Sequence, residues 1–225
     1  MKALILAAGE GKRMGPLTEN RPKPMLPVAG RPFLEHTISA LKSAGVDDVT
    51  ILTGYRGMFI KEHFGDGKDL GVNIKYIVQP KRLGTAHAIK MAKGYMNEPF
   101  LCLNGDVIVN RRLILNLIER YTAEGITLMT LAEVEDASRF GLVKLKGDSV
   151  KGIVEKSGEA RKGAINGGIY LFKTNIFDYI EKTPLSPRGE YEITRSLELL
   201  MKKESVLAVF PEDPWIDIGL SLIHI

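Results

Sequence analysis

Residues Leu6 to Val28 have the sequence LAAGEGKRMGPLTENRPKPMLPV, a glycine-rich loop that follows the apolar run Ala3 to Ala8. A short apolar run that ends at glycines is typical of a buried strand leading into a loop. Glycines let backbone N–H groups approach an anion closely, and Arg13 can hold phosphate oxygens through two parallel hydrogen bonds. Lys23 stands between two prolines that stiffen its backbone. The stretch therefore predicts a triphosphate-binding loop at the end of a strand.

Two better-known phosphate loops do not match this spacing. The dinucleotide pattern GxGxxG requires a glycine where Met14 stands, and Gly15 comes one residue late. The pattern GxxxxGK[ST] fails as well, because Arg13 follows Lys12.

Outward from the loop, strand-like and helix-like segments alternate as far as Glu133. Such alternation predicts an α/β fold with a Rossmann-like, mostly parallel sheet flanked by helices, and with binding sites at the carboxyl ends of the strands. The expected strands are Ala3 to Ala8, Asp48 to Thr53, Val72 to Val78, Phe100 to Leu103 and Thr127 to Glu133. The expected helices are Pro32 to Ala44, Met58 to Phe64, Thr85 to Tyr95 and Arg111 to Tyr121.

Beyond Glu133 the pattern changes to short strands separated by turns. They predict antiparallel additions against the main sheet, a lobe that could close over a second substrate. These strands are expected at Leu142 to Lys146, Val150 to Glu155 and Ala164 to Phe172, followed by a helix at Glu190 to Lys202 and a strand at Val206 to Phe210.

The combination LAAGxGxRM, followed by a lysine and a proline, resembles the signature of the nucleoside-diphosphosugar pyrophosphorylases, which are sugar-1-phosphate nucleotidylyltransferases. The resemblance implies that the LAAG strand end contacts base and ribose and that the loop holds the triphosphate. Arg13 and Lys23 take catalytic roles by this match. The loop residues that would bind nucleotide are Leu6, Ala7, Ala8, Gly9 and Gly11.

A second segment, Gln79 to Ala88, has the sequence QPKRLGTAHA at the end of a predicted strand. A glutamine amide can donate one hydrogen bond and accept another, which matches the O4/N3 edge of uracil or thymine. The resemblance places Gln79 on the pyrimidine, with Gly84 and Thr85 beside it. We expect His87 to be a residue of a helix face without a catalytic role.

Asp106 emerges in the sequence Asn104-Gly105-Asp106 after a predicted parallel strand. A carboxylate at this edge suits Mg²⁺, which takes few carboxylates together with phosphate oxygens and waters. The resemblance makes Asp106 a catalytic metal ligand. The sequence Trp215-Ile216-Asp217-Ile218-Gly219 resembles the WxDIG motif of the family, which makes Asp217 the second ligand.

Further motifs would hold the sugar phosphate. Gly141 permits close approach of a sugar ring, Glu155 can accept hydrogen bonds from hydroxyl groups, and Lys156 can pair with the phosphate in a catalytic role. Asn166 lies in INGGIY, which resembles the NAGIY strand of the family, where asparagine binds the sugar. Residues Pro187 to Thr194 match a family stretch near the sugar pocket.

The resemblance implies a Mg²⁺-dependent transfer from UTP or dTTP to N-acetylglucosamine 1-phosphate or glucose 1-phosphate. A mannose-1-phosphate guanylyltransferase shares the loop, but Gln79 argues against a purine. A catalytically silent regulatory subunit would be expected to lack the arginine, the lysine or the metal aspartate, and all are present. A retaining glycosyltransferase would need a D-x-D pair, whereas only Asp106 stands at the strand end.

Three positions depart from the family pattern. Arg195 stands where aspartate is usual, a charge reversal near the pocket, and Ser157 replaces a proline after Lys156. After Gly219 the usual continuation is replaced by LSLIHI. We therefore expect a nucleotidyltransferase domain at residues 1–219 and an atypical tail at 220–225, truncated before any β-helix domain.

Bulk composition narrows the remaining classes. With 225 residues, 44% of them hydrophobic, the chain is expected to form one domain. The net charge of +4 is spread along the chain, which argues against nucleic acid as a partner. Cys102 is the single cysteine, so no internal disulfide can form, and a cytoplasmic location fits. No segment is long enough to span a membrane. A homo-oligomer is compatible with these observations.

Overall fold

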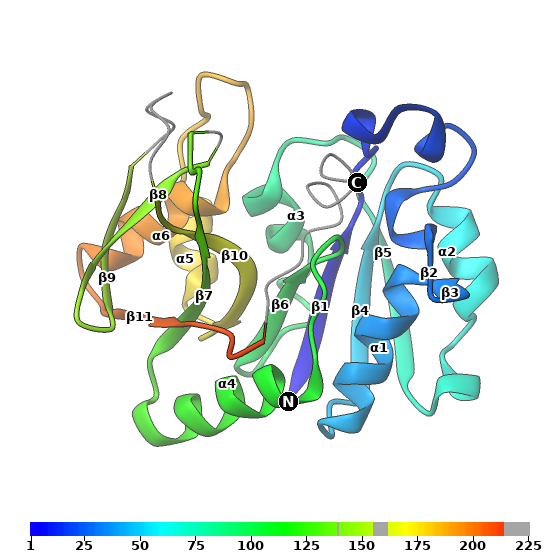
Figure 1. Ribbon diagram of the computed structural model, residues 1–225, viewed down its shortest axis with the longest axis horizontal. Helices are drawn as coiled ribbons and strands as arrows, with labels where there is room; N and C mark the ends of the chain where they lie inside the picture. Colours follow the sequence, from blue (N-terminus) through cyan, green and yellow to red (C-terminus); the bar gives the residue numbers. More distant parts are fainter. Residues whose placement is uncertain (139, 155–161, 214–225) are drawn as a thin grey trace.

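The computed structural model describes residues 1–138, 140–154 and 162–213, with the side chains of Lys12 and Arg13 outside the description. One mixed sheet runs through the described part in the order β5-β4-β1-β6-β10-β7-β11-β9-β8 (Figure 1). Its strands are β1 (Lys2–Ala7), β4 (Asp48–Thr53), β5 (Asn73–Val78), β6 (Phe100–Asn104), β7 (Thr127–Val134), β8 (Leu142–Lys146), β9 (Ser149–Val154), β10 (Gly163–Phe172) and β11 (Val206–Val209).

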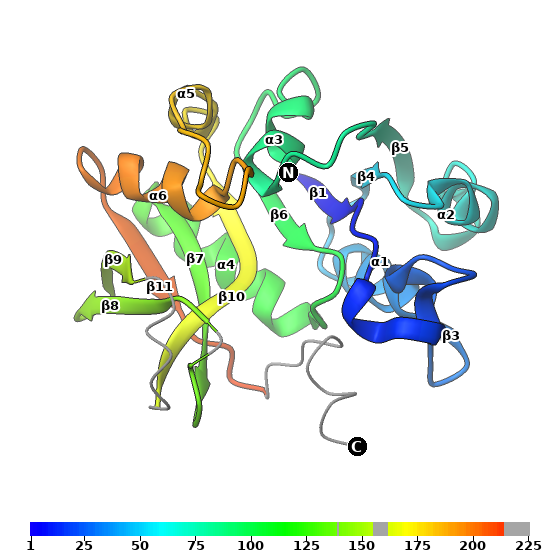
Figure 2. The same ribbon diagram turned by 90° about the horizontal axis from the view of Figure 1, so that it is seen from above.

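Helices cover both faces of this sheet, as the view from above shows (Figure 2). One face carries α3 (Thr85–Met91), α5 (Ile176–Glu181) and α6 (Ile193–Met201), and the other carries α1 (Phe33–Ser43), α2 (Gly57–Phe64) and α4 (Arg111–Glu124). The alternation of side chains along β1 supplies both layers: Ala3 and Ile5 pack with α1 and α2, whereas Leu4 packs with α3. This two-sided burial explains why the first strand is an unbroken apolar run.

Two short elements follow the glycine loop. They are the 3₁₀ helices η1 (Lys12–Thr18) and η2 (Lys23–Met25), and the chain then forms a small hairpin from β2 (Pro27–Val28) and β3 (Arg31–Pro32). A third 3₁₀ turn, η3 (Lys68–Leu70), precedes β5. The sequence patterns did not predict these pieces or the helix α5, because all of them are too short to show a periodicity.

The α/β prediction is confirmed, with one difference in the arrangement of the strands. Strands β4, β1 and β6 are parallel neighbours, and β8 and β9 are antiparallel additions at the sheet edge, as expected. Strand β10, however, lies in the middle of the sheet, antiparallel to both β6 and β7. Its segment from Ile169 to Phe172 is buried and its one polar side-chain group, the Tyr170 hydroxyl, has a partner in Asn166, so it can be covered on both faces.

Helix α6 begins at Ile193 and not at Glu190, where the sequence pattern places its start. The backbone before it is engaged elsewhere, since Tyr191 N–H donates to the carbonyl of Leu83 at 2.7 Å. Helix α3 is likewise shorter than expected and ends at Met91, after which i→i−3 turns tighten the chain. Among the described residues no helix has both the length and the apolar character needed to cross a membrane.

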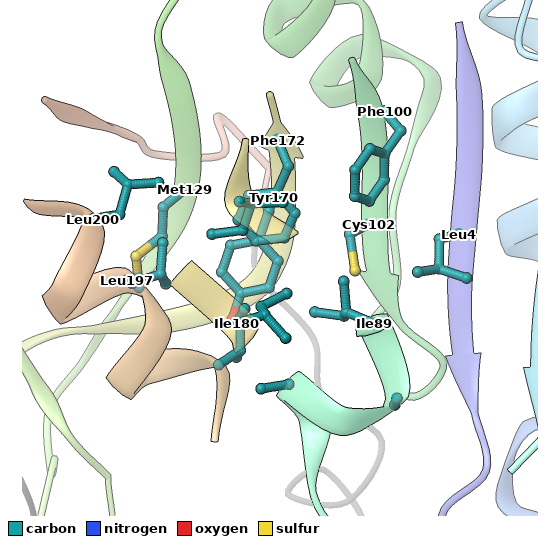
Figure 3. Close-up of a cluster of buried hydrophobic side chains, with 14 of the residues drawn as sticks. Leu4, Ile89, Phe100, Cys102, Met129, Tyr170, Phe172, Ile180, Leu197 and Leu200 are labelled. Carbon is teal, nitrogen blue, oxygen red and sulfur yellow. The ribbon is translucent and has the colours of Figure 1, made fainter. Parts of the chain in front are cut away.

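The larger hydrophobic cluster lies between β6, β10 and the helices α3, α5 and α6 (Figure 3). Tyr170 and Phe172 stack with ring centroids 4.9 Å apart, and Phe100 stacks on Phe177 at 5.7 Å. Cys102 lies among them without solvent exposure, and burial raises the pKa of its thiol.

The burial of Cys102 leads to a labelling prediction. A thiol reacts as the thiolate and only where a reagent can reach it. We expect the folded protein to react with a disulfide reagent at mildly alkaline pH about two orders of magnitude more slowly than the denatured chain, because reaction requires opening of the core. Absorbance of the released thiol measures both rates. Equally fast labelling of folded and denatured protein would show that Cys102 is accessible.

Candidate active site

A cleft of about 640 Å³ opens at the carboxyl ends of the parallel strands. The strands β1, β5 and β6 all run in one direction, so the loops that follow them meet at the same edge of the sheet. All eight residues predicted to bind nucleotide line this cleft, together with Lys23 and Asp106: Leu6, Ala7, Ala8, Gly9, Gly11, Gln79, Gly84 and Thr85. Residues far apart in the sequence thus form one continuous surface.

The floor of the cleft depends on close backbone contacts. Gly105 N–H donates to the carbonyl of Leu6 at 3.0 Å, and a Cβ at Gly105 would lie 2.8 Å from that oxygen. Gly54 approaches Ala8 in the same manner. Such distances exclude any side chain. The glycine after β6 therefore allows Asp106 to lie beside the end of β1.

Lys23 and Asp106 form an ion pair in this cleft. Lys23 Nζ lies 2.7 Å from Asp106 Oδ2, and their side chains are 10% and 31% exposed. Lys23 is held by η2, where Leu26 N–H donates to its carbonyl. The two charges predicted to act on phosphate and metal are therefore side by side, although 83 residues separate them in sequence.

A magnesium ion fits the chemistry of this edge. Asp106 supplies a carboxylate in the same cleft as the glycine loop, and Mg²⁺ needs only one or two carboxylates when phosphate oxygens complete its shell. Within the described ranges no group of three or more His, Cys, Asp or Glu side chains gathers to hold a metal without substrate. The second predicted ligand, Asp217, lies outside the described residues.

Two charged residues that the sequence patterns did not indicate also line the cleft. Arg82 Nη1 lies 2.5 Å from Glu10 Oε2, so an ion pair joins the glycine loop to the Gln79 segment. Neither residue belongs to a motif with a recognisable spacing. Their only sequence signal was their position inside two segments already identified.

The Gly84 segment is clamped by the chain before α6. Gly84 has φ +100°, and a Cβ there would overlap the carbonyl oxygen of Tyr191. Ala86 N–H donates to that oxygen at 2.8 Å, and Thr85 Oγ1 accepts from Ile193 N–H at 3.0 Å. Thr85 thus supplies, from a distant part of the chain, an acceptor for the first N–H of α6, which has no partner within the helix. These contacts also bring Glu190 to the rim of the cleft.

Of the predicted sugar-binding residues, the structure describes Gly141 and Asn166, and neither lines this cleft. Gly141 packs toward β9, where a Cβ would lie 3.2 Å from Ile153. The amide of Asn166 is engaged within β10: Nδ2 donates to the hydroxyl of Tyr170 at 2.6 Å, and Oδ1 accepts from Gly168 N–H. Glu155 and Lys156 lie outside the described residues, as does the side chain of Arg13.

Arg195 lies on a separate surface. Its guanidinium is 3.1 Å from Glu198 Oε2, one helical turn along α6, and both residues line a second cavity of about 570 Å³ between α6, β9 and the Pro184–Pro187 loop. The departure from the family pattern at this position therefore does not change the charge of the nucleotide cleft.

A mixed sheet whose parallel strands end at a glycine loop, a buried lysine and a carboxylate is the arrangement of a nucleotide-binding α/β protein. Residues 2–221 match the family described as nucleotidyl transferase, and the chain belongs to this family. It is 37% identical to the bifunctional protein GlmU of Methanocaldococcus jannaschii over 220 residues, covering 97% of this chain and 51% of that protein. The chain thus spans about half the length of that relative.

Two further proteins are similar to this chain over most of its length and over most of their own. The UTP–glucose-1-phosphate uridylyltransferase AglF of Haloferax volcanii is 32% identical, with 97% of this chain and 91% of that protein covered. A solved structure, the putative glucose-1-phosphate thymidylyltransferase of Bacillus anthracis in complex with sucrose, superposes with a TM-score of 0.90. The two sequences are 30% identical, and the match covers 100% of this chain and 93% of the chain in that structure.

Proposed function

We propose that this protein transfers a nucleotidyl group from UTP or dTTP to a sugar 1-phosphate in a Mg²⁺-dependent reaction, giving an NDP-sugar and pyrophosphate. The observation that carries the proposal is the shared cleft, in which all eight predicted nucleotide contacts meet the Lys23–Asp106 pair. Membership of the nucleotidyl transferase family supports it. The acceptor is N-acetylglucosamine 1-phosphate or glucose 1-phosphate, and the similarity to a glucose-1-phosphate uridylyltransferase supports the second.

In the proposed reaction an oxygen of the sugar 1-phosphate attacks the α-phosphorus of the NTP in line with the leaving group. A new P–O bond forms as the bond between the α-phosphorus and the bridging oxygen breaks, and pyrophosphate departs with that oxygen. No protein base is needed, because a phosphate monoester with a second pKa of about 6 is mostly dianionic at neutral pH. Positioning and neutralisation of charge must then accelerate the reaction.

The residues of the chain divide these tasks. Loop amides and Arg13 would hold the β- and γ-phosphates, Lys23 would contact the α-phosphate, and Lys156 would steady the incoming phosphate. Asp106 and Asp217 would hold Mg²⁺, which when bound neutralises charge on the triphosphate and on pyrophosphate. Lys23 contacts Asp106 in the absence of substrate. A lysine and a metal ion are both positively charged and would repel each other beside one carboxylate. Phosphate oxygens that enter between them would supply the additional negative charge that allows both to bind there.

A pyrophosphate-release screen tests the proposal. The purified chain is incubated with ATP, GTP, CTP, UTP or dTTP and with each of N-acetylglucosamine, glucose and mannose 1-phosphate, with and without EDTA. We expect release with UTP or dTTP and with one of the first two sugars, abolished by EDTA. Release with GTP and mannose 1-phosphate would favour a guanylyltransferase. Binding of nucleotide without release in any mixture would favour a silent regulatory subunit.

A further inference from the structure

The buried amide of Gln79 is held from behind by a histidine. Gln79 follows β5, lines the cleft and is 5% exposed. Its Nε2 lies 2.9 Å from Nδ1 of His87, with a second, longer contact of 3.5 Å to the carbonyl oxygen of Gly84. An amide nitrogen carries two hydrogens and accepts none, so both of its hydrogens point into the protein.

This contact assigns the roles of the two side chains. Because the amide nitrogen can only donate, Nδ1 of His87 is the acceptor of the hydrogen bond from Gln79 Nε2. A proton on Nδ1 would face the amide hydrogens. The amide would then have to turn by half a rotation to offer Oε1 to the ring, and it would present its NH₂ group to the cleft.

The orientation also changes what Gln79 can offer to a base. With Nε2 directed to His87 and Gly84, Oε1 is the amide atom left to contact a ligand in the cleft. Uracil and thymine carry an N–H at position 3 that can donate to this oxygen, whereas the N3 of cytosine is an acceptor and would repel it. From the sequence, Gln79 was expected both to donate a hydrogen bond to the base and to accept one from it. In this orientation its amide can only accept a hydrogen bond from the base.

We propose that His87 is a positioning residue that locks the Gln79 amide with its oxygen toward the cleft and so selects UTP or dTTP over CTP. The inference rests on the proposed nucleotide function of the cleft. His87 itself lies on α3 and does not line the cleft, so it acts through Gln79 and not by touching the base. Rejection arises because a cytosine N3 facing Oε1 leaves two acceptors unpaired in a partly buried site.

Two substitutions at one position separate positioning from support of the fold. His87→Leu removes the hydrogen-bond acceptor but keeps a side chain of similar size. Loss of the acceptor frees the Gln79 amide to turn. His87→Asn keeps an oxygen acceptor near the place of Nδ1. His63→Leu is the matched control, since His63 lies on α2, half-exposed beside Glu35 and away from the cleft.

Calorimetric dissociation constants for UTP and CTP, with and without Mg²⁺, form the first measurement, and KM and kcat for both nucleotides form the second. For His87→Leu we expect UTP to bind about 3- to 10-fold more weakly, the loss of one hydrogen-bonded constraint, with the effect mainly on KM. The preference for UTP over CTP should shrink by a similar factor. His87→Asn should recover most of it, and His63→Leu should match the wild type.

An unchanged preference for UTP in His87→Leu, with lower thermal stability or kcat, would overturn the inference and leave His87 a structural residue. Wild-type protein that binds CTP as tightly as UTP would overturn it as well. If the wild type binds UTP but forms no NDP-sugar, the proposed reaction fails while the dissociation constants still decide the inference. A wild type that binds none of UTP, dTTP and CTP would overturn both.

Discussion

Replacing Asp106 with asparagine is expected to lower the turnover number by about two to three powers of ten, as for the loss of one transition-state contact. The amide keeps the size of the side chain but removes the charge that holds Mg²⁺ and pairs with Lys23 at 2.7 Å. Pyrophosphate release at saturating UTP and sugar 1-phosphate measures the change. In a titration with Mg²⁺, pyrophosphate release by the variant should depend less on the metal concentration than release by the wild type.

Two companion variants separate the metal from the ion pair. Lys23→Met removes the lysine charge but keeps the carboxylate, so it should weaken catalysis without weakening the apparent affinity for Mg²⁺. Asp47→Asn changes an exposed aspartate that pairs with Lys42 at 3.2 Å, and its activity should equal that of the wild type. Near-normal pyrophosphate release by folded Asp106→Asn protein would show that the metal assignment is wrong.

Replacing Gly84 with alanine should produce the largest loss of stability from a single methyl group. The residue has φ +100°, and the new Cβ would overlap the backbone oxygen of Tyr191. Backbone strain costs about 1–2 kcal/mol and overlap with a rigid neighbour about 1–3 kcal/mol, so we expect the free energy of unfolding to fall by about 2–5 kcal/mol. Urea unfolding followed by circular dichroism measures this.

Two other glycines serve as controls for strain and for overlap. Gly125 has φ +64° and open space where a methyl group would lie, so Gly125→Ala reports strain alone, about 1–2 kcal/mol. Gly94 has open space and no positive φ, so Gly94→Ala should leave stability unchanged. If Gly84→Ala costs no more than Gly125→Ala, the Tyr191 segment yields easily and does not clamp the cleft. A weaker affinity for UTP in Gly84→Ala would tie that clamp to nucleotide binding.

Much of the fold could be predicted because its signals are local. The first strand is an apolar run between charged or glycine residues, and α1 repeats apolar side chains at helical spacing, so the predicted bounds of both nearly match the observed ones. The loop motifs were equally local, since a glycine or a proline restricts the backbone wherever it stands. Parallel strands then required that their carboxyl ends share one edge, which placed Asp106 near the glycine loop.

The position of β10 could not be predicted in this way. The apolar character of Ile169 to Phe172 indicates burial but does not specify the neighbouring strands. Insertion between β6 and β7 depends on close approach at the bulge after Asn166, where a Cβ on Gly168 would meet the side chain of Asn104. Such a contact joins residues that are distant in sequence and has no counterpart in the local pattern.

Residue type and near-neighbour spacing were sufficient to predict the α/β class and to select the glycine loop, Lys23 and Asp106 as candidate site residues. Packing of the whole chain was needed to show that Thr85 accepts from the first N–H of α6, that Arg82 joins Glu10 across the cleft and that His87 contacts Gln79. These contacts could not be predicted from the sequence, because a hydrogen bond depends on the distance and direction between atoms, and only the packed chain specifies these. The sequence predicted His87 as a helix-face residue without a catalytic role, and its contact with Gln79, on which the proposed positioning role rests, exists only in the packed chain.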